Sequence, residues 1–132
     1  MSASQNDEKR DSTSADATAL PAFTRLAEGE FHQRLAAVPG NAVVLFTSPN
    51  CGACRVWKRL LPTALSGLAD VWFEVDASEA TGVARYFGIF HLPTIYLYRN
   101  GQFHAELQCE ARPDAIRQTA GALLSAPAHD EP

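Results

Sequence analysis

Long apolar runs are absent from this 132-residue sequence, and none approaches the roughly 20 residues that a membrane-spanning helix needs. The stretch from residue 1 to residue 18 consists mostly of Ser, Ala, Thr, Asp, Asn and Gln, and it lacks the apolar core of a secretory signal. The overall composition, 46% hydrophobic and 20% charged, is that of an ordinary folded domain. We therefore expect a cytoplasmic protein that does not contact a membrane.

An excess of basic residues is also missing. The formal net charge is −4, and the acidic residues that cause it lie in the two ends of the chain, which leaves the middle close to neutral. A nucleic-acid-binding surface needs clustered Lys and Arg, so the sequence offers no nucleic-acid partner. The acidity is that of solvated tails rather than of a binding face.

Cysteine is scarce, with three residues in the whole chain. An odd and low count does not provide a framework of disulfides for a domain of this length, and it is typical of a compartment that keeps thiols reduced. In such a compartment, two closely spaced cysteines are more often catalytic or metal-binding than structural.

The sequence divides into one domain and two tails. Residues 1–19 lack the apolar surface that would offset the entropy of ordering them, so we expect a disordered N-terminal tail. Residues 20–125 carry the periodic apolar patterns of a single domain, expected to be a monomer, and residues 126–132 are expected to form a flexible C-terminal tail.

Strands and helices alternate along the predicted domain. Runs rich in β-branched and aromatic residues indicate strands, apolar residues at helical spacing indicate helices, and Asn100-Gly101 indicates a hairpin turn. This order describes an α/β fold with a central mixed sheet and helices on both faces. Residues 21–26 are expected to form an edge strand, with the beginning of a helix as the alternative. The further expected elements are a helix at 28–38, a strand at 41–47, a helix at 53–68 kinked or broken at Pro62, a strand at 71–76, a helix at 78–86 capped by Ser78 and ended by Gly88, strands at 94–98 and 102–108, and a helix from 113 to 124.

Two cysteines, Cys51 and Cys54, lie where the buried strand at 41–47 gives way to a helix. Unpaired backbone N–H groups and the helix dipole favour an anion at such a turn, and here that anion is a thiolate. Since the thiolate is the attacking species in disulfide exchange, Cys51 is the expected nucleophile. Cys54, one turn further on, is placed to resolve a mixed disulfide.

The spacing alone leaves other interpretations of the pair open. Two cysteines separated by two residues also form half of many zinc sites, or they can simply be neighbours without a shared role. A complete site for zinc would draw on thiolate and imidazole ligands, and Cys109 and His91 are the candidates that would join the pair.

Three motifs in a fixed order carry a resemblance to a known family. They are Cys51-Gly52-Ala53-Cys54 after a strand, Phe87-Gly88-Ile89 with Leu92-Pro93-Thr94 before the next strand, and Tyr98-Arg99-Asn100-Gly101-Gln102 at the hairpin. On these motifs the chain resembles the thioredoxin family over about residues 23–124. The resemblance implies a thioredoxin fold and thiol–disulfide exchange with protein thiols and disulfides, without a bound cofactor and with electrons from a reductase or a small thiol.

The resemblance also implies a groove for the partner. The family has a cis peptide before the proline that corresponds to Pro93, and the backbone there pairs with a bound chain like an added strand. An ordinary strand-breaking proline is the alternative. His91 would screen partners or stabilise the thiolate, or have no role, and Cys109 would form a regulatory adduct or a second disulfide, or merely be buried. The residues implied to line the groove are Asn50, Gly52, Ala53, His91, Leu92, Pro93 and Cys109.

Departures from the family pattern concern the same region. Asn50 replaces the usual Trp, Leu45 stands where the family has a buried acid that assists the second cysteine, and Trp72 replaces the lysine coupled to that acid. A joint loss is consistent, because one buried charge without its partner is costly. We therefore expect weaker activation of Cys54, and we keep as an alternative a module that binds one partner with little redox turnover.

Overall fold

The computed structural model describes residues 23–132, in which five strands form one mixed sheet in the order β2-β4-β3-β5-β6. Strand β3 lies at its centre, parallel to β4 and antiparallel to β5. The central strand therefore ends at the same edge as β4 and next to the start of β5. The strands are β2 (Thr24–Arg25), β3 (Asn41–Thr47), β4 (Val71–Asp76), β5 (Thr94–Arg99) and β6 (Gln102–Glu106).

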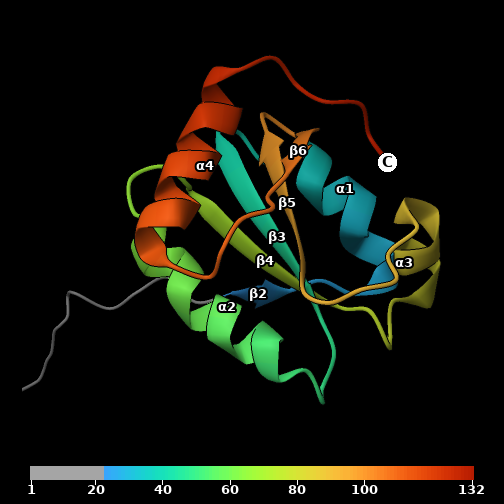
Figure 1. Ribbon diagram of the computed structural model, residues 1–132. Helices are drawn as coiled ribbons and strands as arrows, with labels where there is room; N and C mark the ends of the chain where they lie inside the picture. The colour runs from blue at the N-terminus through green and yellow to red at the C-terminus, as the bar shows by residue number, and fades with distance from the viewer. Residues whose placement is uncertain (1–22) are drawn as a thin grey trace, which may run out of the picture.

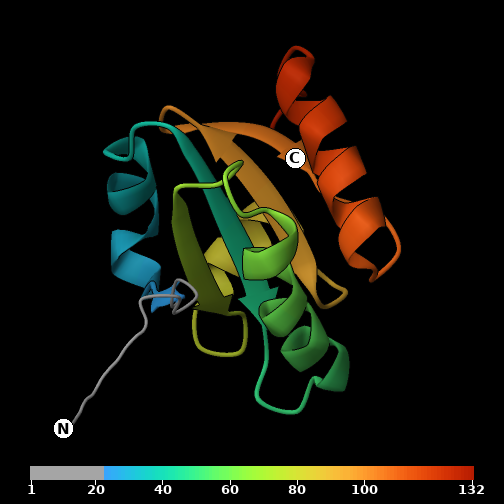
Figure 2. The same cartoon turned by 90° about the vertical axis from the view of Figure 1, so that its left-hand side faces the viewer.

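Helices cover both faces of this sheet. Figure 1 shows α1 and α3 on one side and α2 and α4 on the other, and the turned view in Figure 2 places the sheet between α1 and α4. The arrangement confirms the predicted α/β architecture. The helices are the 3₁₀ helix η1 (Glu28–Glu30), α1 (Phe31–Ala36), α2 (Gly52–Ala64), α3 (Thr81–Phe87) and α4 (Pro113–Ser125).

Two apolar layers hold the helices to the sheet. Successive strand side chains point to opposite faces, so Val44 and Phe46 join the layer under α1 and α3, whereas Val43 and Leu45 join the layer under α2 and α4. All four side chains are at most 1% exposed. Strand β3 is thus buried on both faces, which explains its nearly continuous apolar sequence.

Most elements form where the sequence patterns place them, but several boundaries differ. The predicted cap Ser78 does not begin α3, because its backbone N–H and its hydroxyl both donate to Asp76 in a turn, at 2.9 and 2.6 Å. Helix α2 is not broken at Pro62, but it ends at Ala64, four residues before the predicted end at 68. Strand β6 ends at Glu106, two residues before the predicted end.

The hairpin between β5 and β6 turns at Asn100 and Gly101, with φ of 51° and 83°. Positive φ at both central residues matches the right-handed twist of the strands, as expected for an Asn-Gly turn. The turn packs closely on α1, since a Cβ added to Gly101 would lie 2.6 Å from the carbonyl oxygen of Ala36. Glycine is therefore required here for its space as well as its φ.

We expect Gly101→Ala to destabilise the domain more than Gly67→Ala. Gly67 has the same φ of 83° but open space around it, so its alanine variant bears the backbone strain alone, about 1 kcal/mol. The contact with Ala36 should add about 1–3 kcal/mol in the Gly101 variant. Urea unfolding of both variants measures the difference, and equal losses would contradict the close packing.

The described tail contacts the domain at two points. The His129 N–H donates to the His104 carbonyl at 2.7 Å, and the Tyr86 hydroxyl donates to Glu131 at 3.0 Å. The flexibility expected of residues 126–132 stays a prediction, and the N-terminal tail at 1–19 lies outside the described residues. Between residues 23 and 132, no helix has the length and apolar character to cross a bilayer.

Candidate active site

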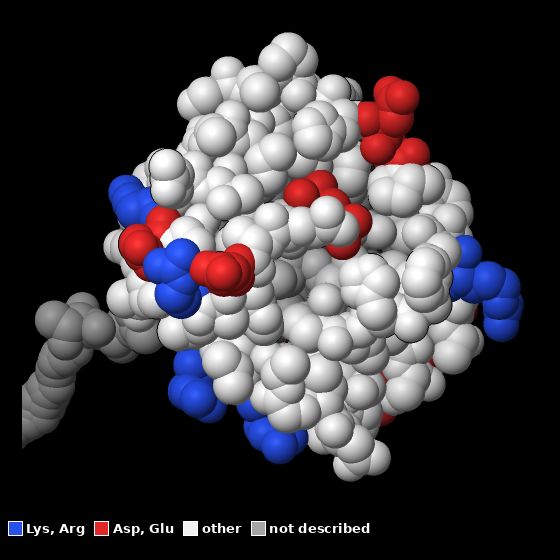
Figure 3. All heavy atoms as spheres, in the orientation of Figure 1, with Lys and Arg blue, Asp and Glu red and all other residues white. Residues whose placement is uncertain are grey.

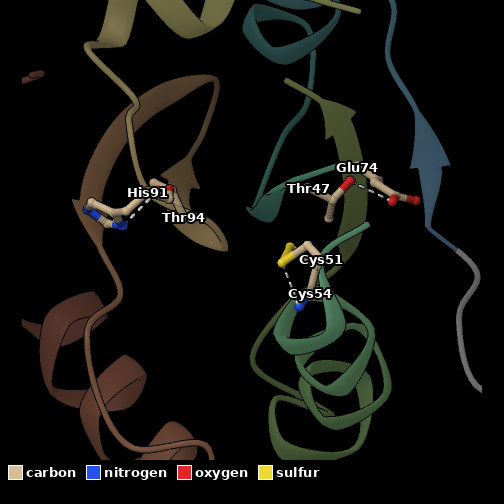
Figure 4. Close-up of a disulfide and its surroundings, with 6 residues drawn as sticks. All are labelled: Thr47, Cys51, Cys54, Glu74, His91 and Thr94. Atoms are coloured by element: carbon tan, nitrogen blue, oxygen red, sulfur yellow. Dashed lines mark hydrogen bonds between the residues drawn. A yellow bond between two sulfur atoms is a disulfide. The ribbon is translucent and has the colours of Figure 1, made fainter. Parts of the chain in front are cut away.

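Cys51 follows the carboxyl end of the central strand β3, and it is the N-cap residue of α2. Its sulfur accepts a hydrogen bond from the backbone N–H of Cys54 at 3.1 Å, as Figure 4 shows. This is the position where free N–H groups and the helix dipole favour a negative charge. The geometry therefore gives the Cys51 sulfur the environment that the sequence predicted for it.

Cys54 is bonded to Cys51 in a disulfide, with 5.2 Å between the two Cα atoms. The two sulfur-bearing residues differ in access, because Cys51 is partly exposed and Cys54 is 2% exposed. Gly52 and Ala53 between them are exposed and small, so they leave the approach to Cys51 open. A disulfide of another protein can therefore contact the Cys51 sulfur, whereas the Cys54 sulfur is too buried for such a contact.

A loop before β5 forms the neighbouring part of the site. The peptide between Leu92 and Pro93 is cis, and both residues are partly exposed. Buried Thr94 fixes the loop by donating its hydroxyl hydrogen to the His91 carbonyl at 2.7 Å. In Figure 4 the His91 ring lies on the far side of Thr94 from the cysteine pair, so a direct contact with the thiolate is not part of this geometry.

Cys109 and Asn50 complete the set of residues predicted from the sequence. Cys109 is a free cysteine that is partly buried against the core under α2 and α4, and this burial raises the pKa of its thiol. Asn50 is exposed beside the disulfide turn. Within residues 23–132, no group of three or more His, Cys, Asp or Glu side chains is arranged to hold a metal ion, so the zinc interpretation gains no support.

A buried carboxylate near the pair was missed at the sequence level. Glu74 on β4 is 7% exposed and accepts hydrogen bonds from Lys58 of α2 at 2.7 Å and from the Thr47 hydroxyl at 2.9 Å. Strand register places Glu74 directly beside Leu45, on the face that meets α2. The sheet therefore carries a buried acid one strand away from the position where the family pattern expects it.

The environment of Glu74 favours its charged form. Burial alone would raise the pKa of this carboxyl, but the hydrogen bonds from Lys58 and Thr47 and the charge of Lys58 outweigh burial and hold the pKa below its ordinary value. Arg25 on β2 adds its charge at 3.7 Å. Glu74 is consequently a carboxylate throughout the neutral pH range.

Phe90 is the second feature that sequence patterns did not reveal. It lies in the loop that leads to His91 and Pro93, and its side chain is 90% exposed. Figure 3 shows few charged side chains in the lower right part of the face, where Figure 1 places this loop and the loop before α2. An aromatic ring that is almost fully exposed is available for contact with another protein.

Comparison with known proteins decides the family. The family model described as thioredoxin matches residues 22–122. The chain belongs to the thioredoxin family. This chain therefore combines a thioredoxin fold with a CxxC-spaced cysteine pair at disulfide distance, the arrangement of a thiol–disulfide oxidoreductase.

Individual relatives agree with this assignment at low identity. The chain is 28% identical to chicken (Gallus gallus) thioredoxin in an alignment 97 residues long that covers 72% of this chain and 91% of that protein. It is 31% identical to chicken protein disulfide-isomerase A3 in an alignment 83 residues long that covers 58% of this chain and only 16% of the isomerase. Among solved structures, oxidised mitochondrial thioredoxin 3 from Saccharomyces cerevisiae has a TM-score of 0.62 and 21% identity, covering 79% of this chain and 95% of that one.

Proposed function

We propose that this thioredoxin-family protein exchanges disulfides with protein partners, with Cys51 as nucleophile and Cys54 as resolving cysteine. Cys51 attacks a partner disulfide and forms a mixed disulfide, and Cys54 then attacks Cys51 and releases the reduced partner. Pro93 and Leu92 hold the partner backbone beside Cys51, and Asn50, Gly52, Ala53, His91 and Cys109 border the contact. The protein works as a monomer in the cytoplasm and receives electrons from a reductase or a small thiol.

One observation carries this proposal: the two sulfurs of a single disulfide differ in access and in hydrogen bonding. Cys51 is partly exposed and accepts the Cys54 N–H, whereas Cys54 is 2% exposed. A structural disulfide has no need of this asymmetry. A catalytic pair does, because one sulfur must meet the partner and the other must wait until the mixed disulfide has formed.

Reduction of a disulfide-bonded protein tests the proposal. Insulin with dithiothreitol as electron donor is a suitable substrate, since its reduced B chain precipitates and the turbidity gives the rate. The wild-type protein should accelerate precipitation catalytically, and Cys51→Ser should not accelerate it at all. Equal precipitation with the wild type and with Cys51→Ser would refute the catalytic assignment and favour a module that binds a partner without exchanging its disulfide.

Phe90 should contribute to docking of the partner and not to the chemistry. We expect Phe90→Ala to raise KM for a protein disulfide by about tenfold, because loss of an exposed aromatic anchor costs on the order of 1–2 kcal/mol of contact energy. The reaction with a small linear disulfide such as bis(2-hydroxyethyl) disulfide should change less than twofold. Equal losses with both substrates would contradict a docking role.

A further inference from the structure

The exchange cycle proposed above, on which this inference rests, requires Cys54 to lose a proton inside the protein. A thiol does not attack a disulfide; its thiolate does. Cys54 is 2% exposed, so its thiol has little direct contact with bulk solvent. Some group near Cys54 has to take up that proton or pass it on while the mixed disulfide occupies Cys51.

A cavity of about 340 Å³ beside Cys54 contains the groups for this task. It is lined by Cys54 and by Thr47, Lys58 and Glu74, and this volume has room for several water molecules. In Figure 4, Thr47 lies between the cysteine pair and the Glu74 carboxylate. The hydroxyl of Thr47 donates to Glu74 and can accept from a donor on the cysteine side.

We propose that Glu74 is the proton acceptor for Cys54, reached through Thr47 and water in this cavity. The proton leaves the Cys54 thiol for the Glu74 carboxylate, and the electron pair on Cys54 sulfur forms the bond to Cys51 sulfur. The bond between Cys51 and the partner sulfur breaks, and its electron pair leaves with the partner thiolate, which takes a proton from solvent. Glu74 then returns its proton to solvent through the cavity.

Among the charged groups around the cavity, the Glu74 carboxylate is the one suited to accept the proton of Cys54. Arg25 from β2 and Lys58 and Arg55 from α2 supply positive charge, and Asp76 and Glu79 supply further negative charge. Asp76 is engaged by Ser78, and the Glu79 side chain is 74% exposed at the rim. Glu74 alone joins Thr47 on the strand beside the site to Lys58 on the helix of the cysteines.

The resolving step can be measured by itself. Reduced protein attacks 5,5′-dithiobis(2-nitrobenzoate) at Cys51 and releases one coloured thiolate, and the attack by Cys54 releases a second one. Stopped-flow absorbance separates the two phases, and a Cys109→Ser background removes the third thiol. In protein that has Glu74, the rate of the second phase should be nearly independent of pH between about pH 6 and 8, because the Glu74 carboxylate accepts the proton of Cys54 throughout this range.

Glu74→Gln should slow the second phase at least tenfold near pH 7 and make it rise roughly tenfold per pH unit, as expected when hydroxide replaces the acceptor. If Glu74 acted only through its charge, Glu74→Gln would speed the second phase, because removal of a negative charge eases ionisation of Cys54. Glu79→Gln removes a negative charge from the rim of the same cavity, and it should leave the second phase unchanged.

Two further variants separate proton transfer from structural support. Thr47→Val removes the hydroxyl group but keeps a side chain of nearly the same shape. It should slow the second phase as Glu74→Gln does. Lys58→Met breaks the ion pair but keeps the carboxylate, so it should lower stability like Glu74→Gln while keeping the second phase within threefold of the parent at pH 8. Equal slowing by Lys58→Met would assign Glu74 a structural role. Absence of any second phase in the parent would instead overturn the exchange cycle itself.

Discussion

We expect replacement of Cys51 by serine to abolish exchange, and replacement of Cys54 by serine to leave the protein covalently attached to its partner. Serine is not ionised at neutral pH and is a far weaker nucleophile than a thiolate, so Cys51→Ser should lose on the order of a thousandfold in rate or more. In Cys54→Ser the first attack should still occur at Cys51, which is the N-cap residue of α2. The mixed disulfide then has no internal route of release.

Mass spectrometry of both variants after incubation with a disulfide-bonded protein checks this prediction. Cys54→Ser should carry one partner chain linked to Cys51, and the adduct should disappear with dithiothreitol. Cys51→Ser should carry none at that position. Since Cys54 is 2% exposed, an adduct on Cys54 in the Cys51→Ser variant would contradict the assigned roles.

Phe46→Ala should lower the free energy of unfolding of the domain more than Gly101→Ala does. Phe46 is 0% exposed, and its ring lies 5.3 Å from that of Tyr96, 6.0 Å from that of Phe31 and 6.1 Å from that of Phe87. Truncation removes the apolar contact and leaves a cavity, at a cost of about 3–5 kcal/mol. A domain of this size should then melt at least about 10 °C lower.

Phe90→Ala is the matched control, because it makes the same chemical change at a side chain that is 90% exposed. It should shift the free energy of unfolding by less than about 0.5 kcal/mol. Thermal melts followed by circular dichroism compare the two variants. A loss below about 1 kcal/mol for Phe46→Ala would mean that the aromatic layer is not the main support of β3.

The framework of the fold could be predicted because its signals are local. The run at 41–47 is apolar throughout and rich in Val, and it forms β3 with those bounds. Asn100-Gly101 and Pro113 carry turn and helix-start preferences within themselves, and both act as expected. The redox turn was visible for the same reason, since Cys51 and Cys54 are joined by the spacing of one helical turn.

The features that the sequence did not reveal depend on how distant elements meet. Ser78 is a good helix cap in isolation, but Asp76 is nearer and captures it in a turn. Glu74 and Lys58 lie 16 residues apart, and they meet only because the register of β3 and β4 turns Glu74 toward α2. One hint was available, because Lys58 follows Cys54 by four residues and so shares its helix face.

The exposure of Phe90 was hidden for a related reason. An aromatic residue near apolar neighbours predicts burial, whereas the loop that carries it leads straight into the cis peptide before Pro93. The path of that loop directs Phe90 outward, with its ring centroid 5.5 Å from that of His91. Such a direction is set by the tertiary structure of the loop and has no periodic pattern in the sequence.

The reduction potential of the Cys51–Cys54 pair tests the central claim most directly. The protein is equilibrated with graded glutathione or dithiothreitol buffers and then alkylated. Mass spectrometry counts the alkylated, and hence free, thiols. We predict a single two-electron transition between about −270 and −120 mV, the range of exchange-active pairs in this fold. A disulfide that stays closed below about −300 mV, or a pair that never closes, would contradict the account.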